Sequence, residues 1–105
     1  MVTLIAMYPT SAPFDRTYYF ATHMPLVEAK WKQHGLKKSE VQTVVGTGGA
    51  GGPSPYHVVT LLYFEDMAAL QNAVASPEGA AVVGDIKNFF GGDPVLLISE
   101  PSAAA

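Results

Sequence analysis

Apolar and polar residues fall along the chain in short blocks, and their order predicts strand, helix, strand, strand, helix, strand. Four blocks rich in aliphatic, β-branched and aromatic residues have the length of strands, and they cover residues 2–8, 40–46, 56–64 and 95–98. Two longer segments carry apolar residues at helical spacing. This order is typical of an α+β ferredoxin-like βαββαβ sandwich, in which helices cover one face of a four-stranded antiparallel sheet.

The first helical segment follows the turn-forming residues 10–13 and is expected to end at Gly35. Asp15 is expected in its first turn, where a carboxylate suits the positive end of the helix dipole. Pro25 lacks a backbone donor and disfavours helix at the preceding residue, so a kink or a break and restart is predicted there. Residues at helical spacing form an expected buried stripe, which consists of Phe20, Met24, Val27 and Trp31.

Asp66 is expected to cap the second helical segment, which is interrupted at Ser76-Pro77 and then resumes as far as Phe90. The glycine- and proline-rich residues 48–55 predict a flexible connection between two strands. The glycine run at 46–52 contains no Gly-Lys-Ser/Thr and precedes a strand, so we do not expect a phosphate-binding loop.

Both faces of the predicted sheet carry apolar side chains. Adjacent apolar pairs occur at Val58-Val59 and Leu61-Leu62, and residues 95–98 are apolar throughout. A sheet with one wet face would instead alternate apolar and polar residues. Because two helices cover only one face, we expect the other face to pack against a second copy of the same sheet. The expected assembly is a homodimer in the form of an α/β barrel.

The length and composition restrict the domain number, the binding partners and the cellular compartment that we expect. The 105 residues predict one domain over residues 1–100, followed by a loose C-terminal tail at 101–105. Only 14% of residues are charged and the formal net charge is −3, so nucleic acid is not an expected partner. The lack of cysteine excludes disulfides and thiolate sites. Neither a signal peptide nor an apolar run of about 18 residues is found, which favours a cytoplasmic location without a membrane partner.

Three histidines are the first candidates for proton transfer, because the pKa of histidine lies near 6.5. His23 lies at the Pro25 interruption, where it either satisfies freed backbone carbonyls or acts as the catalytic group in a cleft. His57 begins a strand and is either an interface residue or part of the same site. His34, near a helix C-terminus, complements the helix dipole. No pair of histidines has the spacing of common metal sites, so neither a metal nor another cofactor is expected.

Asp85 and Asn88 lie three residues apart near the end of the second helical segment, next to Phe89. Asp85 is interpreted either as an exposed carboxylate paired with Lys87 or as a polar group beside a cleft. A dense aromatic set either packs the core or walls a pocket for a flat apolar ligand, and it comprises Tyr8, Phe14, Tyr18, Tyr19, Phe20 and Trp31.

Two motifs resemble the EthD family. The first is Tyr8-Pro9 followed by Phe14-Asp15-x-x-Tyr18-Tyr19-x-x-x-His23-x-Pro25-Leu26. The stretch from Phe14 to Leu26 alone has seven positions that agree with the family at fixed spacing. The second is Ser76-Pro77-x-Gly79 followed by Asp85-Ile86-x-Asn88-Phe89, so the resemblance covers roughly residues 1–100.

The resemblance implies a dimeric α/β barrel, a cleft between sheet and helices, and the role of the family's histidine for His23. The family is named for ethyl tert-butyl ether degradation in bacteria, where its members accompany a monooxygenase system. Relatives of this fold include cofactor-independent monooxygenases, muconolactone-type isomerases and polyketide-processing enzymes. The glycine-rich segment 47–55 is the part of the chain that fits the family pattern least.

Three hypotheses follow. The first is an enzyme that acts without a cofactor on a small apolar oxygenated molecule by isomerisation, dehydration, decarboxylation or oxygenation, with His23 as general acid or base. The second is a binding or accessory protein that carries a hydrophobic intermediate to a partner oxygenase. The third is haem binding, with His23 or His57 as axial ligand. In the first hypothesis, the residues expected to contact or orient the substrate are Tyr8, Tyr18, Tyr19, His57, Asp85, Asn88 and Phe89.

Overall fold

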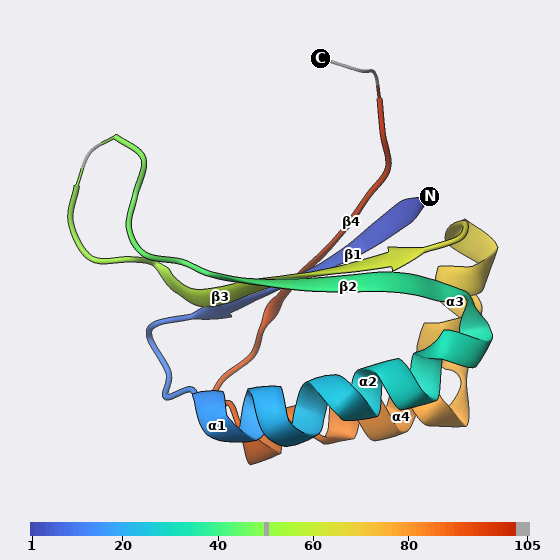
Figure 1. Cartoon of the computed structure of the whole chain (residues 1–105). Coiled ribbons are helices and arrows are strands. Elements are labelled where there is room, and N and C mark those ends of the chain that lie inside the picture. Colours follow the sequence, from blue (N-terminus) through green and yellow to red (C-terminus); the bar gives the residue numbers. More distant parts are fainter. Residues whose placement is uncertain (50, 103–105) are drawn as a thin grey trace.

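The computed structural model describes residues 1–49 and 51–102, and it contains one antiparallel sheet with helices on one face (Figure 1). The spatial order of the strands is β2-β3-β1-β4, with β1 and β3 in the centre. The predicted α+β ferredoxin-like architecture is therefore confirmed. The strands are β1 (Val2–Pro9), β2 (Leu36–Thr43), β3 (Tyr56–Phe64) and β4 (Val95–Ser99).

The helical layer contains both α-helices and shorter turns of other types. The first half of the chain contributes α1 (Arg16–Tyr18), the π-helical turn η1 (Tyr19–His23), α2 (Met24–Trp31) and the 3₁₀ turn η2 (Lys32–His34). The second half contributes α3 (Met67–Ala75), α4 (Pro77–Gly84) and the 3₁₀ turn η3 (Ile86–Asn88). In the described residues, no helix is both long and apolar enough to cross a bilayer.

Strand β2 begins and ends earlier than predicted, at Leu36–Thr43 rather than 40–46. Lys37 and Lys38 at its start are exposed, so the segment lacks the apolar signature of a strand. Because β2 lies at the edge of the sheet, its backbone pairing with β3 holds it in place without a buried side chain at every second position. The prediction for this strand was wrong because it followed the side chains alone.

The interruption expected at Pro25 takes the form of the π-helical turn η1, and the helical backbone continues through it (Figure 1). The amide of Met24 donates to the carbonyl of Tyr19, five residues earlier. Pro25 then falls in the first turn of α2, directly after the π-helical turn, and its missing N–H cannot donate to a carbonyl of that turn. Asp15 is the N-cap of α1 rather than a first-turn residue, and its side chain accepts from the Tyr18 amide.

The extra residue in the π-helical turn shifts the buried stripe of this helical run. Phe20, expected in the stripe, is 45% exposed, and Tyr19 is buried in its place. The remaining expected members are buried, because the spacing of α2 beyond the turn is regular. The run ends at Gly35, which has a φ of 93° as a helix C-cap in the left-handed region, as predicted.

The second helical segment is divided at Ser76, as expected. Asp66 caps α3 by accepting from the Ala69 amide at 2.8 Å, and the Ser76 hydroxyl caps α4 by accepting from the Gly79 amide. The expected continuation of the helix to Phe90 is wrong, because α4 ends at Gly84 and is followed by the 3₁₀ turn η3. Glycine has low helix propensity, which favours an end there.

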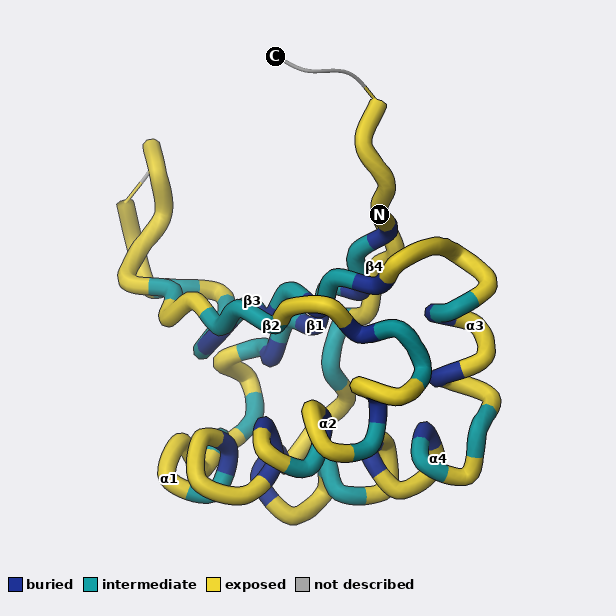
Figure 2. Tube along the Cα trace, turned by 45° about the vertical axis from the view of Figure 1, so that its right-hand side comes forward, coloured by how far each residue is buried: buried dark blue, intermediate teal, exposed yellow. Residues whose placement is uncertain are grey.

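The core lies between the helices and the facing side of the sheet, where buried residues gather (Figure 2). Along β1 every second side chain is buried, which gives the period of a strand with one packed face. The opposite face carries the partly buried Ile5, Met7, Val59 and Leu61, and no helix of the described residues covers it. Pro101 and Ser102 belong to no helix or strand, and residues 103–105 of the expected tail lie outside the described residues, as does Ala50 of the glycine-rich connection.

Candidate active site

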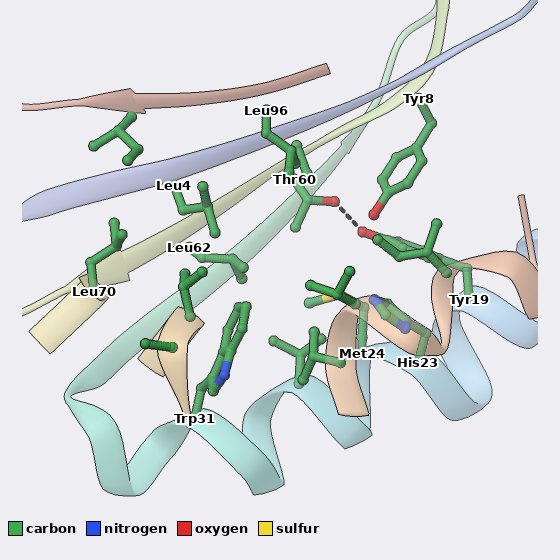
Figure 3. Close-up of a pocket in the computed structure, with 18 of the residues that line it drawn as sticks. Leu4, Tyr8, Tyr19, His23, Met24, Trp31, Thr60, Leu62, Leu70 and Leu96 are labelled. Atoms are coloured by element: carbon green, nitrogen blue, oxygen red, sulfur yellow. Dashed lines mark hydrogen bonds between the residues drawn. The ribbon is translucent and has the colours of Figure 1, made fainter. Parts of the chain in front are cut away.

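A cavity of about 410 Å³ lies between the helical layer and the packed face of the sheet (Figure 3). This volume is in the range of sites for small organic ligands. Most of the lining is aliphatic or aromatic, and no lysine, arginine, aspartate or glutamate is among the lining residues. The polar side chains that contribute are Tyr8, Tyr19, His23, Trp31, Thr60 and Gln71.

The cavity opens between strand β4 and helices α3 and α4. Four of its lining residues are also among the exposed apolar residues of the molecule, with exposed fractions of 45–53%. This rim therefore admits an apolar molecule without a polar barrier. The rim residues are Val74, Val83, Leu96 and Ile98.

His23 lies in the wall of the cavity at the end of the π-helical turn and is buried. Its ring packs against two aromatic rings that also contact each other, those of Tyr19, at 5.5 Å between centroids, and Phe89, at 4.4 Å. Its Nδ1 atom lies 2.9 Å from Oδ2 of Asp85, a residue that is 62 positions later in the chain. With Nδ1–H donating to this carboxylate, Nε2 carries the lone pair.

The Nε2 atom of His23 makes no hydrogen bond within the described residues. The only fully enclosed side-chain polar atom without a partner in those residues is Nε1 of Trp31. Nε2 is therefore not sealed by protein atoms and faces the cavity that His23 lines. A molecule in the cavity has direct access to the basic nitrogen.

Asp85 is held by three donors at the junction of α4 and η3. The Tyr18 hydroxyl donates to Oδ1 at 2.6 Å, and the Asn88 amide donates to the same oxygen at 3.0 Å. Burial by itself would raise the pKa of Asp85, but the hydrogen bonds from Tyr18, Asn88 and His23 together lower the pKa below its usual value. Asp85 is therefore a carboxylate at neutral pH, with a fixed orientation toward His23.

The pKa of His23 is lowered from its ordinary value. Burial disfavours the charged imidazolium and has the largest effect, while the hydrogen bond and the negative charge of Asp85 partly oppose it. The imidazole is therefore neutral at pH 7, and Nε2 can accept a proton from a ligand. The hydrogen bond to Asp85 raises the pKa of Tyr18, so that hydroxyl keeps its proton and stays a donor.

A second polar group in the cavity consists of the hydroxyls of Tyr8, Tyr19 and Thr60. The Tyr19 hydroxyl and Thr60 Oγ1 are hydrogen-bonded, and the Tyr8 hydroxyl points toward the Tyr19 hydroxyl (Figure 3). Burial raises the pKa of Tyr19 to about 12 and that of Tyr8 still further. All three hydroxyls therefore keep their protons at physiological pH.

The structure places most of the predicted site residues at or around this cavity. Tyr8, Tyr19 and His23 line it. Asp85 and Phe89 contact His23, and Tyr18 and Asn88 bind Asp85. None of these four residues lines the cavity.

The other two histidines lie elsewhere. Nε2 of His57 is 2.8 Å from the Ala12 carbonyl, and the ring stacks on Phe14. His57 therefore joins the start of β3 to the segment between β1 and α1, and it does not line the cavity. His34 is paired with Glu78 at 2.9 Å. In the described residues, no group of three or more acidic or histidine side chains is arranged to hold a metal.

The sequence-based set omitted Thr60, the buried polar partner of Tyr19. The signal was present, because Thr60 is a lone hydroxyl residue within an otherwise aliphatic stretch of β3. In a strand with period two, this position shares a face with Val58 and Leu62, which point into the core.

Comparison with known proteins identifies the family. Residues 8–93 match the EthD domain. An uncharacterized 11.0 kDa protein from the thcB-thcC intergenic region of Rhodococcus erythropolis is 29% identical over 94% of this chain and 91% of its own.

Solved structures agree with this match. An EthD-like protein from Ralstonia eutropha JMP134 superposes with a TM-score of 0.84 at 27% identity, covering 99% of this chain and 94% of that chain. An EthD family protein from Bacillus halodurans C-125 has a TM-score of 0.79 at 33% identity, with coverages of 96% and 98%. An antibiotic biosynthesis monooxygenase shares the fold at 15% identity and a TM-score of 0.58, with coverages of 98% and 100%. The motif around His23, the sheet order and these matches together show that the chain belongs to the EthD family.

Proposed function

We propose that this protein is an enzyme that moves a proton on a small, apolar, oxygenated molecule without a cofactor. The observation that carries the proposal is the His23–Asp85 pair at the wall of the cavity. The carboxylate fixes the imidazole with Nδ1 protonated, and the free Nε2 faces the apolar space. This is the arrangement of a general base that has an orienting partner.

The reaction step begins with a proton on a carbon next to a carbonyl group of the ligand. His23 Nε2 takes that proton, and the electron pair of the broken C–H bond moves onto the carbonyl oxygen to form an enolate. Asp85 stabilises the imidazolium that results, because its negative charge is 2.9 Å from Nδ1. Return of the proton to a different atom isomerises the ligand. If the ligand carries a hydroxyl group on the next carbon, the enolate can instead expel it as water, with the His23 imidazolium supplying the proton, and this dehydrates the ligand.

The proton taken from the ligand stays on His23 and does not pass to Asp85. The low pKa of Asp85 and the three donors around it keep the carboxylate ionised throughout the cycle. Asp85 and, through it, Tyr18 and Asn88 are therefore positioning residues. Only His23 touches the ligand among this group.

The test measures deuterium incorporation at the α carbon of small neutral ketones and lactones in D₂O by NMR, with 1-tetralone as the first probe. We expect exchange with the wild type and a loss of about 10²- to 10⁴-fold in His23→Gln, the usual contribution of a general base. Asp85→Asn should lose about 10- to 100-fold, since it removes only an orienting partner. His34→Gln, a change at the histidine paired with Glu78, should retain the wild-type rate. Exchange that persists in His23→Gln contradicts the proposal.

A binding or accessory role is the second candidate, and the apolar rim of the cavity favours it. The rim and most of the wall suit reversible capture of a hydrophobic molecule whether or not it reacts. This role predicts equal affinity of wild type and His23→Gln for each ligand, and no exchange or turnover of any ligand with either protein.

We also propose that the uncovered face of the sheet packs against a second copy of the chain. Ile5 and Leu61 are register partners on this face, as are Met7 and Val59, so the apolar side chains form one contiguous patch. Leu97 on β4 pairs with Ile5 and extends the patch to the edge of the sheet, where it is exposed. Contiguous apolar patches of this kind mark interaction sites, and an identical sheet face is self-complementary under twofold symmetry.

A further inference from the structure

We infer that the hydroxyl cluster of Tyr8, Tyr19 and Thr60 binds an acceptor oxygen of the ligand and restricts the site to neutral carbonyl compounds. The inference deepens the proposed function, since it concerns the same cavity, but the binding that it describes does not depend on proton transfer by His23. It rests on three observations: the number of hydroxyl hydrogens, the position of Tyr19, and the absence of a cation in the lining.

The first observation is a count of donors. Three hydroxyls carry three hydrogens, and each contact between two of them uses one hydrogen. Tyr8 with Tyr19 and Tyr19 with Thr60 make at most two contacts, and these side chains have no other hydrogen bond within the described residues. At least one O–H therefore has no acceptor in the protein, although the cluster is buried against an apolar wall.

An O–H without an acceptor in an apolar environment is costly, so the occupant of the cavity must provide one. The pKa values of Tyr8 and Tyr19 are raised, so neither hydroxyl relieves the shortage by ionising. A carbonyl oxygen fits this need, because it accepts and does not donate. If negative charge develops on that oxygen in a reaction, the same donors bind it more strongly.

The second observation is the position of Tyr19 between the two polar groups. Its ring lies against the imidazole of His23, with an interplanar angle of 21°, and its hydroxyl reaches Thr60 on the sheet. Both the free O–H and the free Nε2 of His23 are thus reached from the same end of the cavity (Figure 3). A ligand whose oxygen binds the cluster has its neighbouring carbon on the His23 side.

The third observation is charge. No lysine or arginine lines the cavity, and the lowered pKa of His23 keeps the imidazole uncharged at neutral pH. A carboxylate or phosphate in the cavity would therefore be buried without a countercharge, which is strongly unfavourable. The site is expected to accept a ketone or lactone and to reject the corresponding acid.

Three bicyclic molecules with the same carbon skeleton test the inference: 1-tetralone, which has a carbonyl oxygen; tetralin, which has none; and the anion of 1,2,3,4-tetrahydro-1-naphthoic acid. Trp31 is the only tryptophan of the chain and lines the cavity, so its fluorescence reports binding directly. With the wild type we expect the ketone to bind about two- to tenfold more tightly than tetralin, the effect of one hydrogen bond, and the anion to bind most weakly.

Variants test whether the hydroxyl cluster causes the tighter binding of the ketone. The triple variant Tyr8→Phe/Tyr19→Phe/Thr60→Val removes all three hydroxyls at nearly constant shape, and it should bring the ketone-to-tetralin affinity ratio toward one. The triple variant is needed because each single variant still leaves at least one O–H without an acceptor. Tyr56→Phe is the matched control, because its hydroxyl has no described hydrogen bond and does not line the cavity, and it should keep the wild-type ratio. The triple variant is compared only if it melts cooperatively; otherwise the affinities of the wild type for the ketone and for tetralin decide the inference.

The outcomes separate this inference from the proposed function. Equal affinity of wild type for ketone and tetralin, or an unchanged ratio in the triple variant, overturns the inference even if deuterium exchange is observed. Binding of the anion as tight as that of the ketone overturns the restriction to neutral ligands. If His23→Gln and the wild type show the same ketone preference but neither catalyses exchange, the inference stands and the proposed proton transfer is wrong.

Discussion

At the scale of single residues, the chemistry of His23 depends on neighbours that are distant in sequence. A solvated histidine has a pKa near 6.5, but burial beside Tyr19 and Phe89 lowers the pKa of His23. Asp85 opposes this shift and determines which ring nitrogen carries the proton. The result is a neutral imidazole in a fixed orientation, which is suited to accepting a proton from an apolar ligand.

The lowered pKa of His23 predicts a loss of stability in mild acid. Between the folded-state pKa and 6.5 the unfolded chain binds more protons than the folded chain, so the free energy of unfolding falls as the pH drops below about 6.5. We expect the Tm of the wild type to fall more between pH 7.5 and 5.0 than the Tm of His23→Gln. The lowered pKa values of Asp85 and Glu78 act with the same sign only below their ordinary values of 3.8 and 4.5, outside this window. Equal losses of Tm in the two proteins would show that His23 is not protonated differently in the folded state.

At the scale of elements, the junction between α3 and α4 determines where Asp85 lies. The Ser76 hydroxyl donates to the Ala73 carbonyl at 2.6 Å and accepts from the Gly79 amide at 3.0 Å, so one side chain ends α3 and begins α4. Gly79 is buried against α3. Because α4 leads directly to Asp85, the close packing of this junction contributes to the position of the carboxylate next to His23.

Substitution of Gly79 tests this packing. A Cβ at position 79 would lie 2.4 Å from the carbonyl oxygens of both Ala73 and Val74, and backbone atoms cannot move aside easily. Gly79→Ala should therefore lower the free energy of unfolding by about 1–3 kcal/mol, as overpacking does. Gly84→Ala is the control in the same helix, where a Cβ meets nothing within 4 Å, and it should raise stability by up to about 1 kcal/mol. Urea unfolding measures both, and a Gly79→Ala protein as stable as the wild type would contradict the prediction.

At the scale of the whole molecule, the sheet has one face covered by helices and one that is not (Figures 1 and 2). The uncovered face carries apolar side chains from both central strands and from β4. The described residues between β2 and β3, 44–49 and 51–55, and the end of β4 both project on this side, away from the helices (Figure 1). The proposed second copy would cover this face and would leave the cavity of each chain on the opposite side of its sheet.

The proposed assembly predicts the mass of two chains for the wild type in size-exclusion chromatography with light scattering. Leu61→Glu places a charge in the centre of the uncovered face, and it should shift the mass to that of one chain, since an unpaired charge at a buried interface is strongly unfavourable. Phe20→Glu is the matched control, an exposed apolar residue of the helical layer, and should leave the mass unchanged. A single-chain mass for the wild type at micromolar concentration would show that the face is not an interface between copies.

Local patterns were sufficient to predict the elements whose signals lie in adjacent residues. The β-branched, aliphatic and aromatic residues of Tyr56–Phe64 predict β3 with its observed ends, and the Asp66 cap and the Gly35 stop follow from the chemistry of helix termini. Predictions from local patterns were wrong where strand pairing or the hydrogen-bond geometry of a helix, and not the local composition, determined the structure. Strand β2 is held by its neighbour despite its lysines, and the π-helical turn exchanges Phe20 for Tyr19 in the buried stripe.

The sequence by itself determined the order of elements, the family motif around His23 and the set of aromatic and polar residues near it, because each depends on spacing along the chain. Only the tertiary structure decided which of these residues act together. It joins His23 to Asp85 and Tyr19 to Thr60 across 62 and 41 residues, and it places His57 against Ala12 instead. The physical reason is that hydrogen bonds and burial depend on distances in space, which are set by the packing of α4 and β3 against the helical run that holds His23.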